Sequence, residues 1–308
     1  MGKHIRVAAV QAAPVFLDKR RTVEKVCAFI RQAAAQGADL IGFPEGFIPT
    51  HPAWLEILPG GGDLALALYK ELFLNAVDLT GPDIDDIKEA CREGKIIAVV
   101  GLNEKRPRTT GTLFNTQIIV GRDGSLLNIH QKYVPTIGER LVHAPGQTGY
   151  RASVATDIGG VSGLICGENS NPLAQYAVAL DYPVVHVAAW PQHFSPGYDM
   201  QEALLIASRG LAYSLKCFVV NAVALVDEAA MAAYGQALDT RAFLEAARAK
   251  GGTSIIGPRG EILAGPLPGG EGLLYADVDP DDLIIPKQVH DFAGHYNRPE
   301  VFAELFGK

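Results

Sequence analysis

Short apolar runs that alternate with amphipathic stretches constrain the fold of this chain more than any other feature of its sequence. The runs have the length of β-strands and are apolar at nearly every position: 5–12, 39–44, 96–102, 114–120, 161–166, 184–189 and 218–226. Strands of this kind occur in sheets that are covered on both faces. The pattern therefore predicts an α/β protein with buried sheets.

Helical patterns separate many of these strands. The clearest follows Asp18, where apolar residues recur at the i, i+3, i+4, i+7 spacing of an amphipathic helix until Gly37. Further helices are expected near 63–79, 83–94, 172–181, 199–215 and 237–249. The turn sequences at 121–124 and 257–260 predict hairpins, so the sheets should mix parallel and antiparallel strands.

No linker or change of composition divides the 308 residues into two domains. We expect one domain over residues 1–285. Residues 286–308 show weak periodicity and end in a segment whose apolar side chains have no obvious place in a core: Phe292, Tyr296, Val301, Phe302 and Leu305. We expect this segment to be a tail that packs on a neighbouring subunit, which predicts a homo-oligomer.

Composition argues against several kinds of partner. Apolar residues make up 48% of the chain, and 27 Lys and Arg residues stand against 34 Asp and Glu residues, a net charge of −7 that would repel nucleic acid. No run of 18 apolar residues predicts a membrane span. The four cysteines are far apart and form no CxxC pair, which is typical of a reducing compartment and predicts a cytoplasmic protein.

The motifs of several common enzyme classes are absent from the sequence. It contains no GxGxxG after a strand, no P-loop, no HExxH and no GxSxG, and its eight histidines include no i, i+4 pair. The usual support for a dinucleotide, P-loop, zinc-peptidase or serine-hydrolase site is therefore missing.

Cys166 is the strongest candidate for a reactive side chain. It ends an apolar strand in the segment VSGLICGENSNPL, and Asn171 and Pro172 then supply an N-cap and a first-turn proline for a helix. A helix N-terminus near the thiol should favour its thiolate. Cys27, Cys91 and Cys217 lie in apolar surroundings, where a cysteine is usually a small buried hydrophobe.

Two other segments carry charged residues that could act together with Cys166. Glu45 comes after the strand at 39–44, at the edge where parallel sheets carry their sites. Lys132 and Glu139 lie seven residues apart around a turn that contains proline. Alone, each would be a solvated loop residue or half of a surface ion pair, so the significance lies in their combination with Cys166.

Together these motifs resemble the Glu-Lys-Cys signature of the nitrilase, or carbon-nitrogen hydrolase, superfamily. Glu45 lies in FPEGFIP, Lys132 in HQKYVPTIGER and Cys166 in LICGENSNPL, and the segments 251–266 and 294–302 resemble those of true nitrilases. The resemblance covers almost the whole chain. It implies a four-layer α-β-β-α sandwich with mixed sheets, which dimerises and often assembles into spirals.

The resemblance also implies roles for the candidate residues. Cys166 would be the nucleophile, Glu45 the general base, Lys132 the positive group that faces the developing charge, and Glu139 a second carboxylate that orients Lys132. The backbone N–H of Gly167 could assist Lys132 in stabilising negative charge on the nitrile nitrogen. The implied reaction converts an organic nitrile and water to a carboxylic acid and ammonia through a thioimidate and a thioester, and it needs neither a metal nor an organic cofactor.

Two positions depart from the pattern of many nitrilases. Gly167 stands where a tryptophan usually follows the nucleophile, and His143-Ala144 stands where a Trp-Gly pair is common. The loss of volume favours room for a branched or aromatic nitrile, unless Trp54, Trp190 or His193 fills the space. Aliphatic, aromatic and arylaceto nitriles all remain open as substrates.

Two other functions remain open at this stage. An amidase or carbamoyl-amide hydrolase could use the same four residues, because an amide passes through the same thioester. A remote alternative is an inactive, filament-forming or interaction protein that retains the fold, although the presence of all four residues argues against it.

Overall fold

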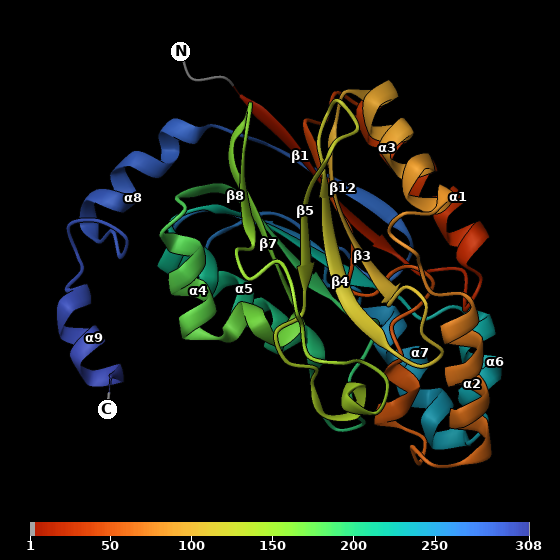
Figure 1. The fold of residues 1–308 in the computed structure, drawn as a ribbon. Helices are drawn as coiled ribbons and strands as arrows, with labels where there is room; N and C mark the ends of the chain where they lie inside the picture. The colour runs from red at the N-terminus through yellow and green to blue at the C-terminus, as the bar shows by residue number, and fades with distance from the viewer. Residues whose placement is uncertain (1–3, 308) are drawn as a thin grey trace.

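The computed structural model describes residues 4–307, and its centre is a pair of β-sheets that face each other between helices (Figure 1). In the first sheet β1, β2 and β3 run parallel, β4 and β5 continue as antiparallel hairpins, and β12 pairs antiparallel with β1. The bounds are β1 Ile5–Ala12, β2 Leu40–Gly42, β3 Ile97–Lys105, β4 Leu113–Val120, β5 Leu126–Gln131 and β12 Gly272–Val278.

The second sheet is built around three parallel strands. β7, β8 and β9 run parallel, β6 pairs antiparallel with β7, and the short hairpin of β10 and β11 lies beside β9. The bounds are β6 Ser153–Thr156, β7 Gly159–Ile165, β8 Pro183–Trp190, β9 Phe218–Ala224, β10 Ser254–Ile256 and β11 Ile262–Ala264. The ends of β1 and β9 pair at Gln11–Val223 and Ala12–Ala224, which joins the two sheets.

Apolar side chains fill the space between the two sheets. Val7 and Val99 of the first sheet belong to the same fully buried cluster as Val187 and Val220 of the second. The outer face of the first sheet is covered by α1 (Lys19–Ala35) and α3 (Pro82–Gly94), and that of the second by α4 (Pro172–Ala179) and α5 (Met200–Leu215). The expected four-layer α-β-β-α sandwich with mixed sheets is confirmed.

Local signals account well for the helix bounds. The side chain of Asp18 accepts a hydrogen bond from the N–H of Arg21, which caps α1, and Gly37 after the helix has a φ of 76°. The helix expected at 63–79 ends earlier, because α2 spans Asp63–Leu74 and Val77 instead donates its N–H to the carbonyl of Asn103 at 2.8 Å. A contact with β3 therefore overrides helix periodicity there.

The remaining helices lie around one end of the sandwich and along the C-terminal segment (Figure 1). The sequence patterns did not predict α6 or the strands β6 and β12. No helix within residues 4–307 has the length and apolar character needed to cross a bilayer. The bounds are α6 Glu228–Tyr234, α7 Leu238–Lys250, α8 Ile284–Val289, α9 Pro299–Phe306, and the 3₁₀ turns η1 Ala53–Glu56, η2 Ile137–Leu141, η3 Cys166–Ser170 and η4 Pro280–Leu283.

The sheet topology brings the candidate residues to one edge. Strands β2, β5, β7 and β8 all end at this edge. The parallel pairing of β1 with β9 gives the parallel strands of both sheets one direction, and two antiparallel pairings return β5 to the direction of β3. Glu45 follows β2, Lys132 follows β5, and Cys166 follows β7. Side chains from distant parts of the sequence can therefore meet across the two sheets.

Candidate active site

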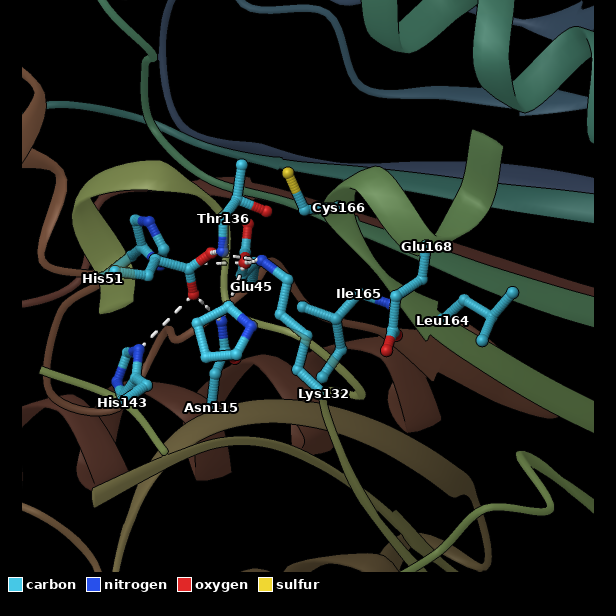
Figure 2. Close-up of polar contacts among 12 residues, drawn as sticks. Glu45, His51, Asn115, Lys132, Thr136, His143, Leu164, Ile165, Cys166 and Glu168 are labelled. Atoms are coloured by element: carbon cyan, nitrogen blue, oxygen red, sulfur yellow. Dashed lines mark hydrogen bonds and ion pairs between the residues drawn. The ribbon is translucent and has the colours of Figure 1, made fainter. Parts of the chain in front are cut away.

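Glu45, Lys132 and Glu139 form a buried cluster at this edge (Figure 2). The ammonium Nζ of Lys132 donates to Oε1 of Glu45 at 2.8 Å and to Oε2 of Glu139 at 2.5 Å. The side chains of Lys132, Glu45 and Glu139 are exposed by 1%, 0% and 4%, respectively. The spacing of Lys132 and Glu139 therefore reflects an internal ion pair and not a surface one.

Asn115 of β4 is a fourth member of this cluster, and the sequence analysis missed it. Its amide Nδ2 donates at 2.8 Å to Oε1 of Glu45 and at 2.8 Å to Oε1 of Glu139. The backbone carbonyl of Asn115 accepts the backbone N–H of Lys132 at 2.8 Å. An amide within the apolar run 113–120 was the available signal, because a buried polar side chain needs partners.

The charges in the cluster stabilise one another. Burial disfavours the ammonium of Lys132, but the carboxylates of Glu45 and Glu139 outweigh this and raise the pKa of Lys132 well above its usual range. Burial also disfavours an ionised Glu139, yet the Lys132 ammonium and the contact with His143 hold the pKa of Glu139 well below its usual range. Lys132 therefore stays a cation and Glu139 an anion at neutral pH.

Cys166 begins η3 directly after β7, and its side chain lies beside the cluster (Figure 2). Its φ of 51° lies in the left-handed region, which is uncommon for residues other than glycine and costs about 1–3 kcal/mol. Burial, followed by the negative charge of Glu45, raises the pKa of the Cys166 thiol well above its usual range. The expectation that a helix N-terminus favours the thiolate is wrong for the resting protein, since desolvation dominates.

Glu168 connects the turn of Cys166 to the segment of Lys132. Its carboxylate accepts the N–H of Ile165 at 2.9 Å, the N–H of Tyr133 at 2.6 Å, and contacts Nε2 of His130 at 2.9 Å. Burial disfavours an imidazolium, but the Glu168 carboxylate outweighs burial and raises the pKa of His130. Because Tyr133 follows Lys132 and Ile165 precedes Cys166, this carboxylate fixes the two segments relative to each other.

The backbone at Gly167 borders open space. The N–H of Gly167 donates to the thiol of Cys166 and partly opposes the rise in its pKa. A Cβ at Gly167 would have only Oγ1 of Thr136 nearby, at 3.9 Å. The chain therefore leaves room beside the thiol where a larger side chain would project.

The three aromatic candidates for the substrate pocket lie in different surroundings. Trp190 ends β8 and belongs to the same apolar cluster as Cys166. Its backbone carbonyl accepts a hydrogen bond from the N–H of Glu45 at 3.2 Å. Trp54 and His193 both contact Tyr234. The ring centroids of Trp54 and Tyr234 are 6.5 Å apart, and Nε2 of His193 lies 3.0 Å from the Tyr234 hydroxyl. The structure groups Trp190 with Cys166, and Trp54 and His193 with Tyr234.

Glu45, Glu139 and His51 could together offer ligands to a cation. One ligand atom from each lies within 4.8 Å of the others. The ammonium of Lys132 already binds both carboxylates, so a metal ion at this position would compete with it. The expectation of a metal-free site stays a prediction.

Comparison with known proteins places this geometry in context. The model of a protein family described as "Carbon-nitrogen hydrolase" matches residues 6–284. The chain is 33% identical to an arylacetonitrilase of Aspergillus kawachii, with 98% of this chain and 91% of the relative covered. It is 34% identical to an aliphatic nitrilase of Rhodococcus rhodochrous, with 98% and 82% covered.

Solved structures share the fold at lower sequence identity. A carbon-nitrogen hydrolase from Helicobacter pylori superposes with a TM-score of 0.74 at 19% identity, over 99% of both chains. An amidase from Nesterenkonia sp. gives a TM-score of 0.65 at 19% identity, over 92% of this chain and 94% of the other. These likenesses support the sandwich architecture.

Proposed function

The chain belongs to the carbon-nitrogen hydrolase family, and we propose that it is a nitrilase. In this proposal an organic nitrile and two water molecules yield a carboxylic acid and ammonia. The observation that carries it is the buried contact of Lys132 with both Glu45 and Glu139 beside the thiol of Cys166. The nitrilase names of relatives that match nearly the whole chain support the choice of substrate class.

The first step is the attack of sulfur on the nitrile carbon. Because the Cys166 thiol is neutral at rest, its proton must leave as the S–C bond forms. Glu45 lies beside the thiol and is the base that takes this proton. The same carboxyl group then returns the proton to the nitrile nitrogen, which gives a neutral thioimidate.

Negative charge develops on the nitrile nitrogen during this step. The ammonium of Lys132 is fixed by two carboxylates before substrate binds, so it stabilises the charge without reorganising. The backbone N–H of Gly167 is a second donor at the thiol. Glu139 orients Lys132 and does not itself touch the reacting atoms.

Two water molecules complete the reaction. The first adds to the thioimidate carbon with loss of a proton to Glu45, and the resulting tetrahedral intermediate expels ammonia to leave a thioester. The second adds to the thioester, and the S–C bond breaks to release the carboxylic acid and restore the thiol. Each hydrolytic step returns the Glu45 proton, so the side chains end as they began.

An amidase remains the second candidate, because attack of Cys166 on an amide would give the same tetrahedral intermediate, which expels ammonia to leave the same thioester. The solved amidases share less than 25% identity and support the fold alone. The space at Gly167 adds volume without adding a hydrogen-bonding side chain for an amide NH₂ group. Nitriles are therefore favoured over amides, and the open space favours branched or aromatic ones.

The test compares nitriles with the matching amides. Phenylacetonitrile, benzonitrile and short aliphatic nitriles would each be assayed beside their amides, with ammonia and acid measured together. We expect kcat/KM for the best nitrile to exceed that of its amide by at least tenfold, about 1.4 kcal/mol of transition-state binding. Faster turnover of amides throughout would assign the protein as an amidase.

Covalent trapping tests the nucleophile. We expect Cys166→Ala to fold and to lose ammonia release, while wild-type protein shows a mass increase on Cys166 during turnover. Cys217→Ala is the matched control, because Cys217 is also buried but lies directly before β9. Activity in Cys166→Ala together with its loss in Cys217→Ala would contradict the proposal. A chain that never releases ammonia would be the inactive interaction protein.

We also propose that the protein is a homo-oligomer, either a dimer or a larger assembly such as a spiral. A groove of about 1010 Å³ lies between the C-terminal segment and helices α4 and α5, and most of its lining is apolar. Val301, Phe302, Leu305 and Phe306 of α9 are exposed by 41–69%. A second copy of the chain would cover both surfaces, since each copy carries the same apolar groove and helix.

The domain and location assignments remain predictions. The family match ends at residue 284, near the expected boundary between the domain of residues 1–285 and the tail of residues 286–308. A cytoplasmic location is supported by four cysteines that form no disulfide with one another.

A further inference from the structure

His130 of β5 lies between two acceptors, and each of its ring nitrogens contacts one of them. Nδ1 lies 2.7 Å from the backbone carbonyl oxygen of Gly149, and Nε2 lies 2.9 Å from Oε2 of Glu168. Because a carbonyl oxygen can only accept, Nδ1 of His130 carries a proton. The side chains of His130 and Glu168 are exposed by 2% and 6%. The position of the one proton between them therefore decides whether this buried pair is charged or neutral.

The other contacts of Glu168 favour its ionised form. Oε2 also accepts the backbone N–H of Ile165 at 2.9 Å, and Oε1 accepts the backbone N–H of Tyr133 at 2.6 Å. Hydrogen bonds from backbone N–H groups stabilise a carboxylate relative to a carboxylic acid. The proton between the two side chains then lies on Nε2, and His130 is a cation. Burial opposes this charge, but the Glu168 carboxylate outweighs burial and raises the pKa of His130.

The contact on the Nδ1 side of His130 is fixed by the backbone. Gly149 has a φ of 69°, and a Cβ at this position would lie 1.9 Å from the carbonyl oxygen of Ile129. The loop after η2 can approach β5 so closely because this residue is glycine. That approach brings the Gly149 carbonyl to Nδ1. The acceptor for the first proton is therefore built into the fold.

The neighbouring titratable groups leave His130 as the cation that balances Glu168. The ammonium of Lys132 donates to the two carboxylates of the catalytic cluster. The ring of Tyr133 lies 4.8 Å from that of His130 between centroids, and burial raises the pKa of its phenol to about 12, so it is neutral. A buried carboxylate without a cation is costly, which is a second reason for the charge on His130.

His186 of β8 also acts on His130, and it is a buried histidine of the opposite kind. Its Nε2 lies 2.9 Å from Oδ1 of Asn169, whose Nδ2 donates to the carbonyls of Leu164 and Cys166. Oδ1 is therefore the acceptor and Nε2 carries the proton, while Nδ1 accepts from the hydroxyl of Ser162 at 2.8 Å. A neutral ring satisfies both partners, and burial lowers the pKa of His186 to about 3.

The charged pair joins the two segments that carry the catalytic thiol and ammonium. His130 lies two residues before Lys132, and Glu168 lies two residues after Cys166. The turn at Cys166 has a φ of 51°, a strained conformation that persists only where surrounding contacts hold it. The bond from His130 to Glu168 is one such contact, because Glu168 also binds the backbone directly before Cys166.

We propose that His130 is a cationic positioning residue, which holds Glu168 as a carboxylate and through it fixes the turn of Cys166 against the segment of Lys132. His130 touches no reacting atom in this scheme and acts on the site through Glu168. The proposal rests on the proposed nitrilase function for its kinetic consequences, but not for the charge of His130.

Neutron diffraction from crystals of the wild-type protein would locate the protons directly. We expect deuterium on both ring nitrogens of His130 at neutral pD. His186 is the internal control, since the same map should show deuterium on its Nε2 alone. The measurement needs no variant, so it does not depend on whether a substituted protein folds. A bare ring nitrogen on His130 would overturn the proposal.

The pH dependence of stability measures the same charge in solution. The reference is the double variant His130→Gln/Glu168→Gln, in which neither group titrates. We expect the free energy of unfolding of wild type minus that of the reference to fall as the pH rises from 6.5 to 9. The reason is that folded His130 keeps a proton that the unfolded chain releases near pH 6.5.

His186→Gln is the matched control for this measurement. Folded His186 stays neutral at pH values where the unfolded chain binds a proton, so wild type minus His186→Gln should fall as the pH decreases below 6.5. The two histidines thus predict opposite slopes. A difference between wild type and the double variant that does not change between pH 6.5 and 9 would contradict a cationic His130.

Kinetics test the positioning role. We expect His130→Gln to lower kcat at least tenfold with KM changed by less than threefold, because the substitution removes the cation that holds Glu168 and no contact with the substrate. Ser162→Ala is the control, since it breaks the matched contact of His186 and should lower stability without changing kcat per folded molecule. An unchanged kcat in His130→Gln, or equal losses in the two variants, would overturn the role.

The two proposals fail in different ways. A protein with a cationic His130 that hydrolyses amides and not nitriles would retain this inference and lose the nitrilase assignment. Nitrile hydrolysis by a protein whose His130 has a bare ring nitrogen would do the reverse.

Discussion

Among the individual residues, Lys132 should contribute most to stabilising the charge that develops in the transition state. We expect Lys132→Met to lower kcat by at least a factor of about 10², since loss of one preorganised donor costs about 3 kcal/mol and here a full charge also disappears. Glu139→Gln should cost less, because the glutamine keeps an acceptor for Lys132. Steady-state kinetics with the best nitrile would measure both effects.

Arg140 supplies the control for this prediction. Its guanidinium donates to the carbonyl of Pro135 at 3.1 Å and does not reach the cluster. Equal kinetic losses at Glu139 and Arg140 would indicate that the whole motif is structural. Thermal melting of each variant would separate lost catalysis from unfolding, because a buried carboxylate without its partner is destabilising.

Asn115 sets the distance between the two carboxylates. We expect Asn115→Ala to lower kcat/KM by about tenfold to a hundredfold, because two hydrogen bonds to charged groups disappear at about 1.5–3 kcal/mol each, offset by relaxation. Asn115→Asp should be worse, since it places a third carboxylate beside Glu45 and Glu139. If the aspartate variant proved as active as wild type, a role for the Asn115 donor would be excluded.

At the scale of elements, β2 must lie close to the second sheet. A Cβ at Gly42 would come within 2.8 Å of Cγ1 of Val187 and of Val220. We expect Gly42→Ala to destabilise the protein by about 1–3 kcal/mol through overpacking, seen as a lower urea midpoint. Activity per folded molecule should also fall, because Glu45 follows this strand.

Gly61 is a suitable control for Gly42. It lies in the exposed loop before α2, and an added Cβ would meet nothing within 4 Å. Gly61→Ala should leave the free energy of unfolding from urea denaturation within about 0.5 kcal/mol of wild type, as for most surface substitutions. Equal losses in the two variants would show that close packing of the sheets is not the cause.

At the scale of the whole molecule, the C-terminal segment should set the assembly. We expect truncation after Val289, which retains α8 and removes α9, to reduce the particle mass measured by light scattering. Phe302→Asp should do the same, because Phe302 lines the apolar groove and is half exposed. Leu238→Asp is the control, since Leu238 is exposed by 88% but lies at the start of α7. A full-length protein that is monomeric across dilution would contradict the proposal.

Local sequence determined the order of the elements and the position of the reactive residues along the chain. The apolar runs at 5–12, 114–120 and 184–189 became β1, β4 and β8, and the helix expected after Asp18 became α1. Periodicity and capping act between neighbours in sequence, so they can be recognised without a structure. Glu45, Lys132 and Cys166 were likewise found from the short motifs in which they lie.

Only the tertiary structure decided how these residues interact. Asn115 and Glu45 are 70 residues apart in sequence, and His143 and Asn103 are 40 residues apart. No local sequence pattern therefore predicts either contact. The protonation states also depend on packing, because burial and neighbouring charges act in opposite directions on Lys132 and Glu139. The raised pKa of the Cys166 thiol has the same origin: desolvation by the assembled sandwich outweighs any local preference of a strand-to-helix turn.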